Sequence, residues 1–234
     1  MTSQEPVAIV TGSRKGLGKA VAEFLLSNGY AVEGCSRTGA DWTAHGYVHH
    51  CLDVADEAAV KKMLADVRKR HGRLDAVINN AGIAMMNHFL VTPSAALDQV
   101  LETNVRGTFL MSREAAKLMQ RRRYGRIINL TTVAVPLALD GEAIYAASKG
   151  AVETLTRTLA RELAPVGITC NAIGPGPIQT DLTRGIPQEK IEALLARLMI
   201  KRWSTFEDVT NVIEFLLRPE SSAITGQTIY LGGA

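Results

Sequence analysis

Tyr145 and Lys149, four positions apart, are the residues of this chain best suited to chemistry. On a helix, residues four apart share one face, so a phenol and an ammonium group point into the same space. Tyrosine alone titrates near pH ~10, and a nearby positive charge favours its phenolate form. The pair therefore predicts a proton donor and acceptor that works near neutral pH.

A glycine-rich turn near the start of the chain predicts a phosphate-binding site. It follows an apolar run, Val7–Thr11, and opens a helical pattern, Leu17–Ser27. Glycines let the backbone approach a pyrophosphate closely, and a helix N-terminus supplies free N–H groups and a partial positive charge. The residues of the turn that we expect to contact a cofactor are Gly12, Ser13, Arg14, Lys15, Gly16, Leu17 and Gly18.

Short apolar runs alternate with longer helical patterns along the whole chain. Runs rich in Val and Ile are typical of strands that are covered on both faces, and the alternation predicts a parallel, doubly wound sheet. The expected strands are Val7–Thr11, Ala31–Cys35, Tyr47–Cys51, Ala76–Asn79, Arg126–Leu130, Ile168–Ala172 and Thr228–Leu231. The expected helices are Leu17–Ser27, Glu57–Arg70, Ser94–Arg122, Ala143–Leu163, Gln188–Leu198 and Phe206–Leu217. The link from Ser36 to Gly46 is short for a crossover helix, so a reduced turn is expected there.

Size and composition suit one large α/β domain over residues 1–234, since 47% of the 234 residues are apolar. The net charge of +3, from 26 basic and 23 acidic residues, is too balanced to indicate nucleic acid or a membrane surface. Cys35, Cys51 and Cys170 lie apart in apolar stretches without metal-ligand spacing, which predicts buried thiols and no metal site. No secretory signal pattern or membrane-length apolar run is present, so a cytoplasmic protein is expected.

Three motifs together resemble the short-chain dehydrogenase/reductase family. They are the Gly-x3-Gly-x-Gly spacing of the turn, the run Asn79-Asn80-Ala81-Gly82, and the Tyr145-x3-Lys149 pair, in the family's order and over essentially the whole chain. The resemblance implies a single Rossmann-type domain with a seven-stranded parallel sheet, helices on both faces, and a homotetramer. It implies that Tyr145 is the catalytic acid and base and that Lys149 binds the nicotinamide ribose and lowers the tyrosine pKa.

The resemblance also assigns two further polar side chains to the reaction. Asn104 matches the family asparagine that organises a proton-relay water. Thr132 stands thirteen residues before Tyr145, where the family usually carries serine. Threonine keeps the hydroxyl, but its methyl group restricts rotation and takes space beside the substrate carbonyl. We expect the chemistry to survive in a smaller or differently angled pocket, with Thr131 as the alternative hydroxyl.

The end of the second expected strand predicts NADP(H) as the cofactor. Ser36 stands where NAD enzymes of the family carry aspartate, and Arg37 follows it. A hydroxyl and a guanidinium suit a phosphate, and an aspartate would repel it. Glu33 is expected inside the strand and away from its tip. The other cofactor contacts that the resemblance implies are Asp53 and Val54 for the adenine, Asn80, Ala81 and Gly82, and Pro175, Gly176, Ile178 and Thr180 near the nicotinamide.

Within the family the chain most resembles bacterial 3-oxoacyl-[acyl-carrier-protein] reductases, which implies reduction of a 3-oxoacyl thioester in fatty acid biosynthesis. Arg123 matches one carrier-docking arginine, whereas the second docking position holds Val166. That departure, Thr132 and the short second crossover favour a pathway-specific acyl reductase over a housekeeping one. The alternatives are a dehydrogenase of a cyclic alcohol, diol or sugar-like substrate, and a non-catalytic NADPH-binding protein. The candidates for further polar substrate contacts are Asn87, His88, Asp140 and Glu142.

Overall fold

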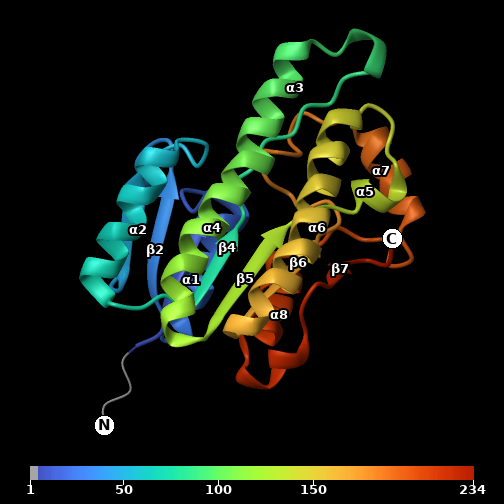
Figure 1. Ribbon diagram of the computed structural model, residues 1–234. Coiled ribbons are helices and arrows are strands. Elements are labelled where there is room, and N and C mark those ends of the chain that lie inside the picture. The colour runs from blue at the N-terminus through green and yellow to red at the C-terminus, as the bar shows by residue number, and fades with distance from the viewer. Residues whose placement is uncertain (1–4) are drawn as a thin grey trace.

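A seven-stranded parallel sheet forms the centre of the computed structural model, which describes residues 5–234 (Figure 1). The strand order β3-β2-β1-β4-β5-β6-β7 reverses direction between β1 and β4, as in a doubly wound sheet. The strands are β1 (Val7–Thr11), β2 (Ala31–Ser36), β3 (Tyr47–Cys51), β4 (Ala76–Asn79), β5 (Gly125–Leu130), β6 (Ile168–Gly174) and β7 (Thr228–Tyr230). The predicted fold class is confirmed.

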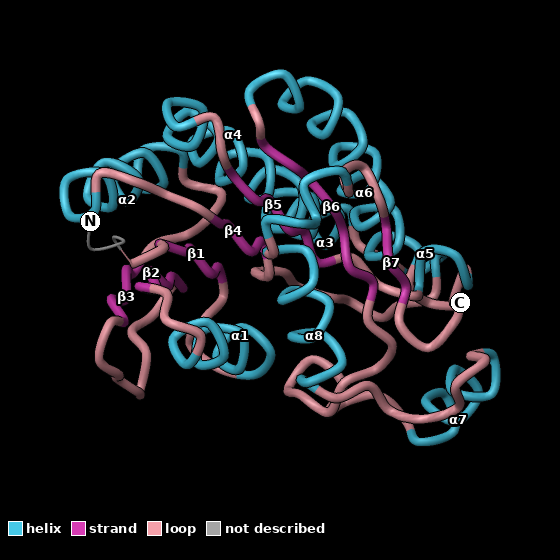
Figure 2. The backbone as a smooth tube through the Cα atoms, turned by 90° about the horizontal axis from the view of Figure 1, so that it is seen from below, coloured by secondary structure: helices cyan, strands magenta, loops and turns pink. Residues whose placement is uncertain are grey.

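Helices cover both faces of this sheet (Figure 2). On one face α1 (Gly16–Ser27) and α8 (Phe206–Leu217) bury Val21, Leu25 and Ile213 against the strands. On the other face lie α2 (Glu57–His71), α4 (Gly107–Met119) and α6 (Ala143–Leu163). The remaining helices are α3 (Ser94–Leu101), α5 (Ala134–Leu137) and α7 (Gln188–Arg197), with short 3-10 turns at Phe89–Val91, Gln120–Arg122, Ala164–Val166 and Pro219–Ala223.

The long helix predicted over Ser94–Arg122 is interrupted, which the sequence pattern did not indicate. A π-helical segment, Glu102–Arg106, joins α3 to α4, and a 3-10 turn ends the run. Single π turns inside α-helices frequently mark functional sites, because they shift one side chain out of the regular spacing. The short helix α5 was not predicted either. The reduced turn between β2 and β3 is confirmed, since residues 37–46 contain no helix.

The cysteine prediction is correct for two of three thiols. Cys35 and Cys170 are buried, but Cys51 is exposed. It closes β3, which lies at the edge of the sheet and is only partly covered, so a strand residue there meets solvent. Over residues 5–234 the helices include none that is long and apolar enough to cross a membrane.

Glu33 lies inside β2, as predicted, and faces two histidines and an arginine. Its side chain is 1% exposed and is contacted by His50 Nε2 at 2.6 Å, His71 Nε2 at 2.7 Å and the Arg70 guanidinium. Burial alone would raise the pKa of Glu33, but the hydrogen bonds from these three residues outweigh it and lower the pKa to about 2. The carboxylate therefore ties β2 to β3 and α2.

Replacing Glu33 by glutamine is expected to lower the free energy of unfolding at pH 7 by roughly 3 kcal/mol, because it removes one partner of a buried ionic cluster. A carboxyl with a lowered folded-state pKa stabilises the protein above its unfolded pKa, and that stability is lost as the pH falls from about 4.5 toward about 2. Urea unfolding of both proteins at pH 7 and at lower pH tests this. The exposed acid Glu162 on α6, replaced in the same way, is the control. Equal stability of Glu33→Gln and wild type at pH 7 would contradict the assignment.

Candidate active site

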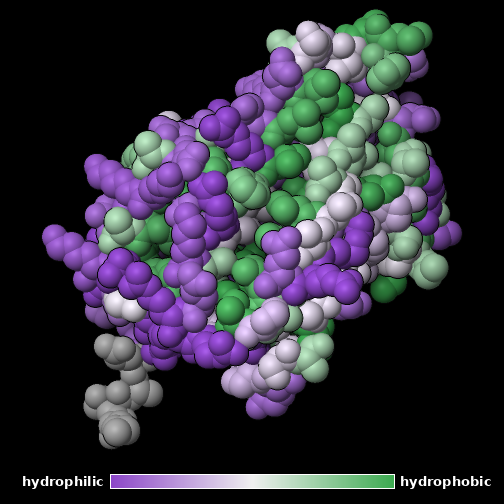
Figure 3. All heavy atoms as spheres, in the orientation of Figure 1, coloured by the Kyte–Doolittle hydropathy of each residue, from purple (hydrophilic) through white to green (hydrophobic). Residues whose placement is uncertain are grey.

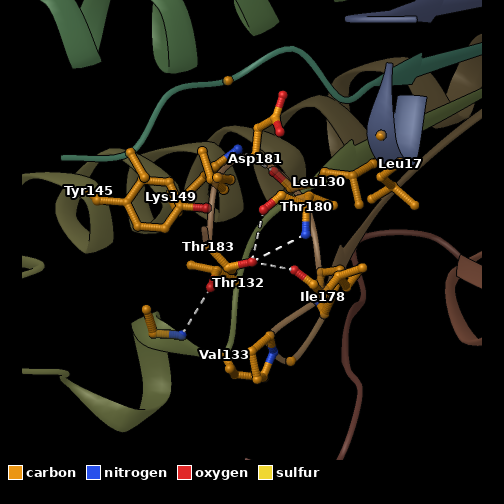
Figure 4. Close-up of a pocket in the computed structure, with 18 of the residues that line it drawn as sticks. Leu17, Leu130, Thr132, Val133, Tyr145, Lys149, Ile178, Thr180, Asp181 and Thr183 are labelled. Carbon is orange, nitrogen blue, oxygen red and sulfur yellow. Dashed lines mark hydrogen bonds between the residues drawn. The ribbon is translucent and has the colours of Figure 1, made fainter. Parts of the chain in front are cut away.

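A cavity of about 640 Å³ opens where the carboxyl ends of β1, β4, β5 and β6 meet (Figure 4). This is the edge at which doubly wound sheets bind their ligands. The predicted site residues that line it come from the glycine-rich turn, the run after β4, Thr132, the Tyr145–Lys149 pair and the segment after β6. They are Gly12, Lys15, Gly16, Leu17, Gly18, Asn80, Ala81, Gly82, Thr132, Tyr145, Lys149, Pro175, Gly176, Ile178 and Thr180.

Tyr145 and Lys149 project from the first turns of α6 into this cavity, as Figure 4 shows. The Lys149 ammonium lies 6.0 Å from the centre of the Tyr145 ring and donates a 2.7 Å hydrogen bond to the carbonyl of Leu130. Thr132 lines the same cavity, close enough to Tyr145 to influence the pKa of its phenol. Thr132 Oγ1 also accepts from the backbone N–H of Ala134 at 3.2 Å. The predicted tyrosine, lysine and threonine are therefore brought together around one space.

The electrostatics of Tyr145 differ from the prediction. Burial raises the pKa of Tyr145 above its usual value, the charge of Glu142 adds to this rise, and the Thr132 hydroxyl works in the opposite direction. Burial also lowers the pKa of Lys149 to about 8. The sequence argument counted the positive charge and left out desolvation, which disfavours the charged form of both groups. Here desolvation is the larger effect.

Asn104 lies in the π-helical segment and is fully buried. Its Oδ1 accepts from the N–H of Ile83 at 2.9 Å, while its Nδ2 donates to the Ile83 carbonyl at 2.9 Å and to Ser148 Oγ at 3.0 Å. The side chain does not line the cavity. It fastens the segment after β4 to the helix that carries Tyr145 and Lys149. Its predicted role in proton relay stays a prediction.

The glycine-rich turn fits a dinucleotide phosphate. A Cβ atom at Gly18 would lie 2.2 Å from the carbonyl oxygen of Gly12, and one at Gly12 would lie 2.9 Å from Asn80 Nδ2. Asn80 donates to the Thr11 carbonyl at 2.9 Å, so the ends of β1 and β4 are held together. Only glycines permit this approach, and it leaves backbone N–H groups at the start of α1 facing the cavity.

The segment after β6 closes over this turn. Lys15 pairs with Asp181, and Asp181 also pairs with Arg184 at 2.7 Å. Thr183 Oγ1 donates to the carbonyl of Ile178 at 2.8 Å, a contact drawn in Figure 4. The sequence did not indicate that Asp181 links this segment to the phosphate turn, since nothing local marks a contact across 166 residues.

Beyond the cavity, a hydrogen-bonded chain connects the turn to the tip of β2. Ser13 Oγ lies 2.8 Å from Tyr47 Oη, which lies 2.7 Å from His49 Nδ1, and His49 Nε2 lies 2.9 Å from Ser36 Oγ. Trp42 stacks on Tyr47 with ring centres 4.0 Å apart. Sequence reasoning missed these aromatic residues, although Tyr47 and His49 are two apart on a strand and so share one face.

Seven predicted site residues lie outside the cavity lining. Two of them, Ser36 and Arg37, stand at the tip of β2, and Arg37 has no ion-pair partner within residues 5–234. Arg14 pairs with Asp41 at 3.8 Å. The seven are Ser13, Arg14, Ser36, Arg37, Asp53, Val54 and Asn104.

Comparison with known proteins identifies the family. A family model described as enoyl-(acyl carrier protein) reductase matches residues 12–233. The chain belongs to the short-chain dehydrogenase/reductase family. Among the similar proteins, the 3-oxoacyl-[acyl-carrier-protein] reductase FabG of Escherichia coli K12 is 33% identical over 239 residues, which cover 100% of this chain and 98% of that protein. FabG of Staphylococcus aureus Mu50 is 35% identical, with 97% of this chain and 96% of that protein covered.

Solved short-chain dehydrogenase/reductase structures superpose closely on this one. A protein provisionally described as a gluconate dehydrogenase from Agrobacterium tumefaciens has a TM-score of 0.89 and 33% identity, covering 97% of this chain and 94% of that one. ElxO with NADP bound has a TM-score of 0.89 and 29% identity, covering 97% of each chain. A Tyr-to-Phe variant of ElxO with NADPH bound gives the same TM-score and identity. These relatives share this chain's fold over nearly its whole length.

Proposed function

We propose that this short-chain dehydrogenase/reductase uses NADP(H) to reduce a ketone to a secondary alcohol, with a 3-oxoacyl thioester as the first candidate substrate. The observation that carries the proposal is the convergence of Tyr145, Lys149 and Thr132 on the cavity beside the glycine-rich turn. The similarity to the two FabG proteins favours the thioester, and the bound nucleotide of ElxO favours NADP(H).

Each residue has a distinct part in the proposed reaction. Tyr145 donates its proton to the carbonyl oxygen of the ketone, and Thr132 holds that oxygen with a second hydrogen bond. The ammonium of Lys149 stabilises the negative charge that develops on the tyrosine oxygen, an effect that is strong because the site is desolvated. NADP(H), when bound along the glycine-rich turn, supplies the hydride that reduces the carbonyl carbon.

A panel assay tests the proposal. NADPH consumption is measured with 3-oxoacyl thioesters, cyclic ketones and sugar-derived ketones, beside an NADH control. Turnover of the thioesters with NADPH supports the first candidate. A preference for the acyl-carrier-protein thioester over a small N-acetylcysteamine thioester would support carrier docking near Arg123, whose guanidinium donates to the Pro165 carbonyl at 2.7 Å. Failure with every ketone, while NADPH still binds, would contradict the enzyme proposal.

The second candidate is a dehydrogenase of a cyclic alcohol, diol or sugar-like substrate. It is favoured by the close structural similarity to the Agrobacterium tumefaciens protein. Turnover restricted to hydroxylated or cyclic ketones would select it. A non-catalytic NADPH-binding protein remains the alternative from another class, and it predicts nucleotide binding without any ketone turnover.

Arg37 is proposed to set the cofactor preference. Replacing Arg37 by alanine is expected to raise the Kd for NADPH roughly tenfold to a hundredfold, because a charge-assisted bond to a phosphate is lost. The Kd for NADH should change little, since NADH lacks that phosphate. Titration of the nucleotide fluorescence measures both values, and replacement of Arg161 on α6 is a distant control. An equal loss of affinity for both nucleotides would show that Arg37 does not read the phosphate.

We also propose a homotetramer in the cytoplasm. Several large apolar side chains are exposed on the tip before α3 and along α3 and α4, where Figure 3 shows apolar patches among more polar residues. They include Phe89 at 71%, Leu90 at 82% and Phe109 at 40% exposure. Apolar patches of this kind are typical of interfaces between subunits. Light scattering of the purified protein measures the mass directly.

A further inference from the structure

The Glu142 carboxylate lines the substrate end of the cavity without a partner. Glu142 precedes α6 by one residue and stands three residues before Tyr145, a spacing that places side chains near each other. Its carboxylate makes no capping bond to the helix, and within residues 5–234 this carboxylate has neither a hydrogen bond nor an ion pair. Carboxylates that are partly buried and unpaired in a cavity are costly to stability, so their presence indicates a functional role.

The backbone around Glu142 is fixed. Its N–H donates to the Leu139 carbonyl at 3.3 Å, and the neighbouring Gly141 has a φ of +81° and accepts from the N–H of Asn87 at 2.9 Å. A glycine is suited to this left-handed backbone position. The carboxylate is therefore held at the cavity by a defined loop conformation.

Within residues 5–234 no cation forms an ion pair with the Glu142 carboxylate. Lys190 on α7 acts on it only through its charge, and the Lys190 Nζ lies 3.8 Å from the sulfur of Met86. The other acid in the cavity lining, Asp181, is paired with Lys15 and Arg184. Among the described residues, Glu142 is thus the unpaired acid in the lining beside Tyr145, and Lys149 supplies a cation to the same cavity.

We propose that Glu142 selects substrates by charge: it excludes ketones with a free carboxylate near the reacting carbonyl and admits neutral ones. This inference rests on the proposed ketone reduction. In a 3-oxo acid the carboxylate lies two carbons from the ketone, which brings it toward Glu142 when the ketone oxygen is held by Tyr145 and Thr132. The substrate carboxylate and the Glu142 carboxylate carry like charges, and like charges that lie close together repel strongly in a partly desolvated site. In a thioester the carboxylate of the substrate is replaced by a neutral group, so this repulsion is absent. In a hydroxylated substrate, a hydroxyl group can donate a hydrogen bond to the Glu142 carboxylate.

The test compares 3-oxobutanoate with its N-acetylcysteamine thioester in wild type and Glu142→Gln. Wild type is expected to prefer the thioester in kcat/KM, and the variant is expected to reduce that preference roughly tenfold to a hundredfold, mainly through KM for the acid. Asp140→Asn, two residues away, exposed and outside the cavity lining, is the matched control and should keep the wild-type ratio. An unchanged ratio in Glu142→Gln would overturn the inference.

The pH dependence of the same ratio is a second readout. Burial raises the pKa of Glu142 above 4.5, and the charge of Lys190 opposes this rise. The carboxyl of Glu142 loses its charge as the pH falls, and the carboxyl of 3-oxobutanoate does so as well. The preference of wild type for the thioester should therefore decrease more steeply toward acid pH than that of Glu142→Gln, whose ratio lacks the contribution of Glu142. Tyr145, Lys149, Lys190 and the Asp181–Arg184 pair are present in both proteins, so the difference between the two pH profiles isolates Glu142. Parallel pH profiles of the ratio in wild type and Glu142→Gln would contradict the inference.

Binding separates this inference from the proposed function. If wild type reduces neither compound, the thioester proposal fails, and the affinities of 3-oxobutanoate and its methyl ester, measured by calorimetry with NADP+ present, then decide about Glu142. A preference for the ester that disappears in Glu142→Gln supports charge selection. Equal affinities in wild type, or failure of both compounds to bind, would overturn it.

Discussion

Replacing Tyr145 by phenylalanine is expected to lower kcat for ketone reduction by about 10³-fold or more, because the general acid is removed from the transition state. The aromatic ring stays, so packing at the start of α6 is preserved. NADPH binding should remain within roughly a factor of two of wild type, since only one hydroxyl is lost. The solved Tyr-to-Phe variant of ElxO, which holds NADPH, is a parallel from a relative. Single-turnover kinetics and nucleotide titration measure the two quantities separately.

Tyr230→Phe is the matched control for this experiment. Tyr230 on β7 donates to Glu153 Oε1 at 2.8 Å and does not line the cavity. Its replacement removes the same hydroxyl group from a different part of the molecule, so a change in stability with little loss of kcat is expected. Unchanged turnover in Tyr145→Phe would show that another group supplies the proton. A non-catalytic role for the Tyr145–Lys149 pair would follow only if wild type also showed no turnover.

The sheet could be predicted from the sequence because its strands are continuous apolar runs. The bounds of β1, β3 and β4 match the expected ranges, as do those of α6 and α8. The interruption between α3 and α4 could not be predicted, since one extra residue in a helical turn leaves the apolar spacing on both sides almost unchanged. The π-helical segment is nevertheless what places Asn104 against Ile83 and Ser148.

The candidate site was predictable where a motif is local and unpredictable where contacts span the chain. The glycine-rich turn and the Tyr145–Lys149 spacing are each contained in one short segment. Glu142 was named only among several polar loop residues, and the structure brings it, but not Asn87, His88 or Asp140, to the cavity lining. The sign of the pKa shift on Tyr145 was wrong for a related reason. Desolvation depends on everything that packs around a group, which a local pattern does not contain.

Lys149→Met is expected to abolish most of the ketone reduction and to make the protein more stable at pH 7. Methionine matches the length of lysine but carries no charge, so the stabilisation of the tyrosine oxygen is lost, at a cost to kcat of roughly 10²-fold or more. Nucleotide affinity should fall as well, if Lys149 binds the ribose as the family resemblance implies. These losses are measured by the same kinetics and titrations as for Tyr145→Phe.

The gain in stability follows from the burial of Lys149. Its side chain is 4% exposed, and burial lowers its pKa from 10.5 to about 8. A lysine with a lowered folded-state pKa destabilises the protein at pH values below about 8, and this cost disappears as the pH rises from about 8 toward 10.5. This pKa shift corresponds to a destabilisation of wild type by about 3 kcal/mol. The variant escapes this cost but loses the hydrogen bond from Lys149 to the Leu130 carbonyl, which contributes ~1 kcal/mol.

Urea unfolding of Lys149→Met and wild type between neutral and alkaline pH tests this argument. The variant should be more stable by about 2 kcal/mol at pH 7, and the difference should shrink and then reverse as wild-type Lys149 loses its proton. Lys62→Met, at an exposed position on α2, should show little difference across the same range. A variant that is inactive and also less stable at pH 7 would mean that Lys149 is a structural residue. An inactive but more stable variant would mean that the fold retains a buried ammonium at a cost to its own stability, which is the trade-off expected of a group kept for catalysis.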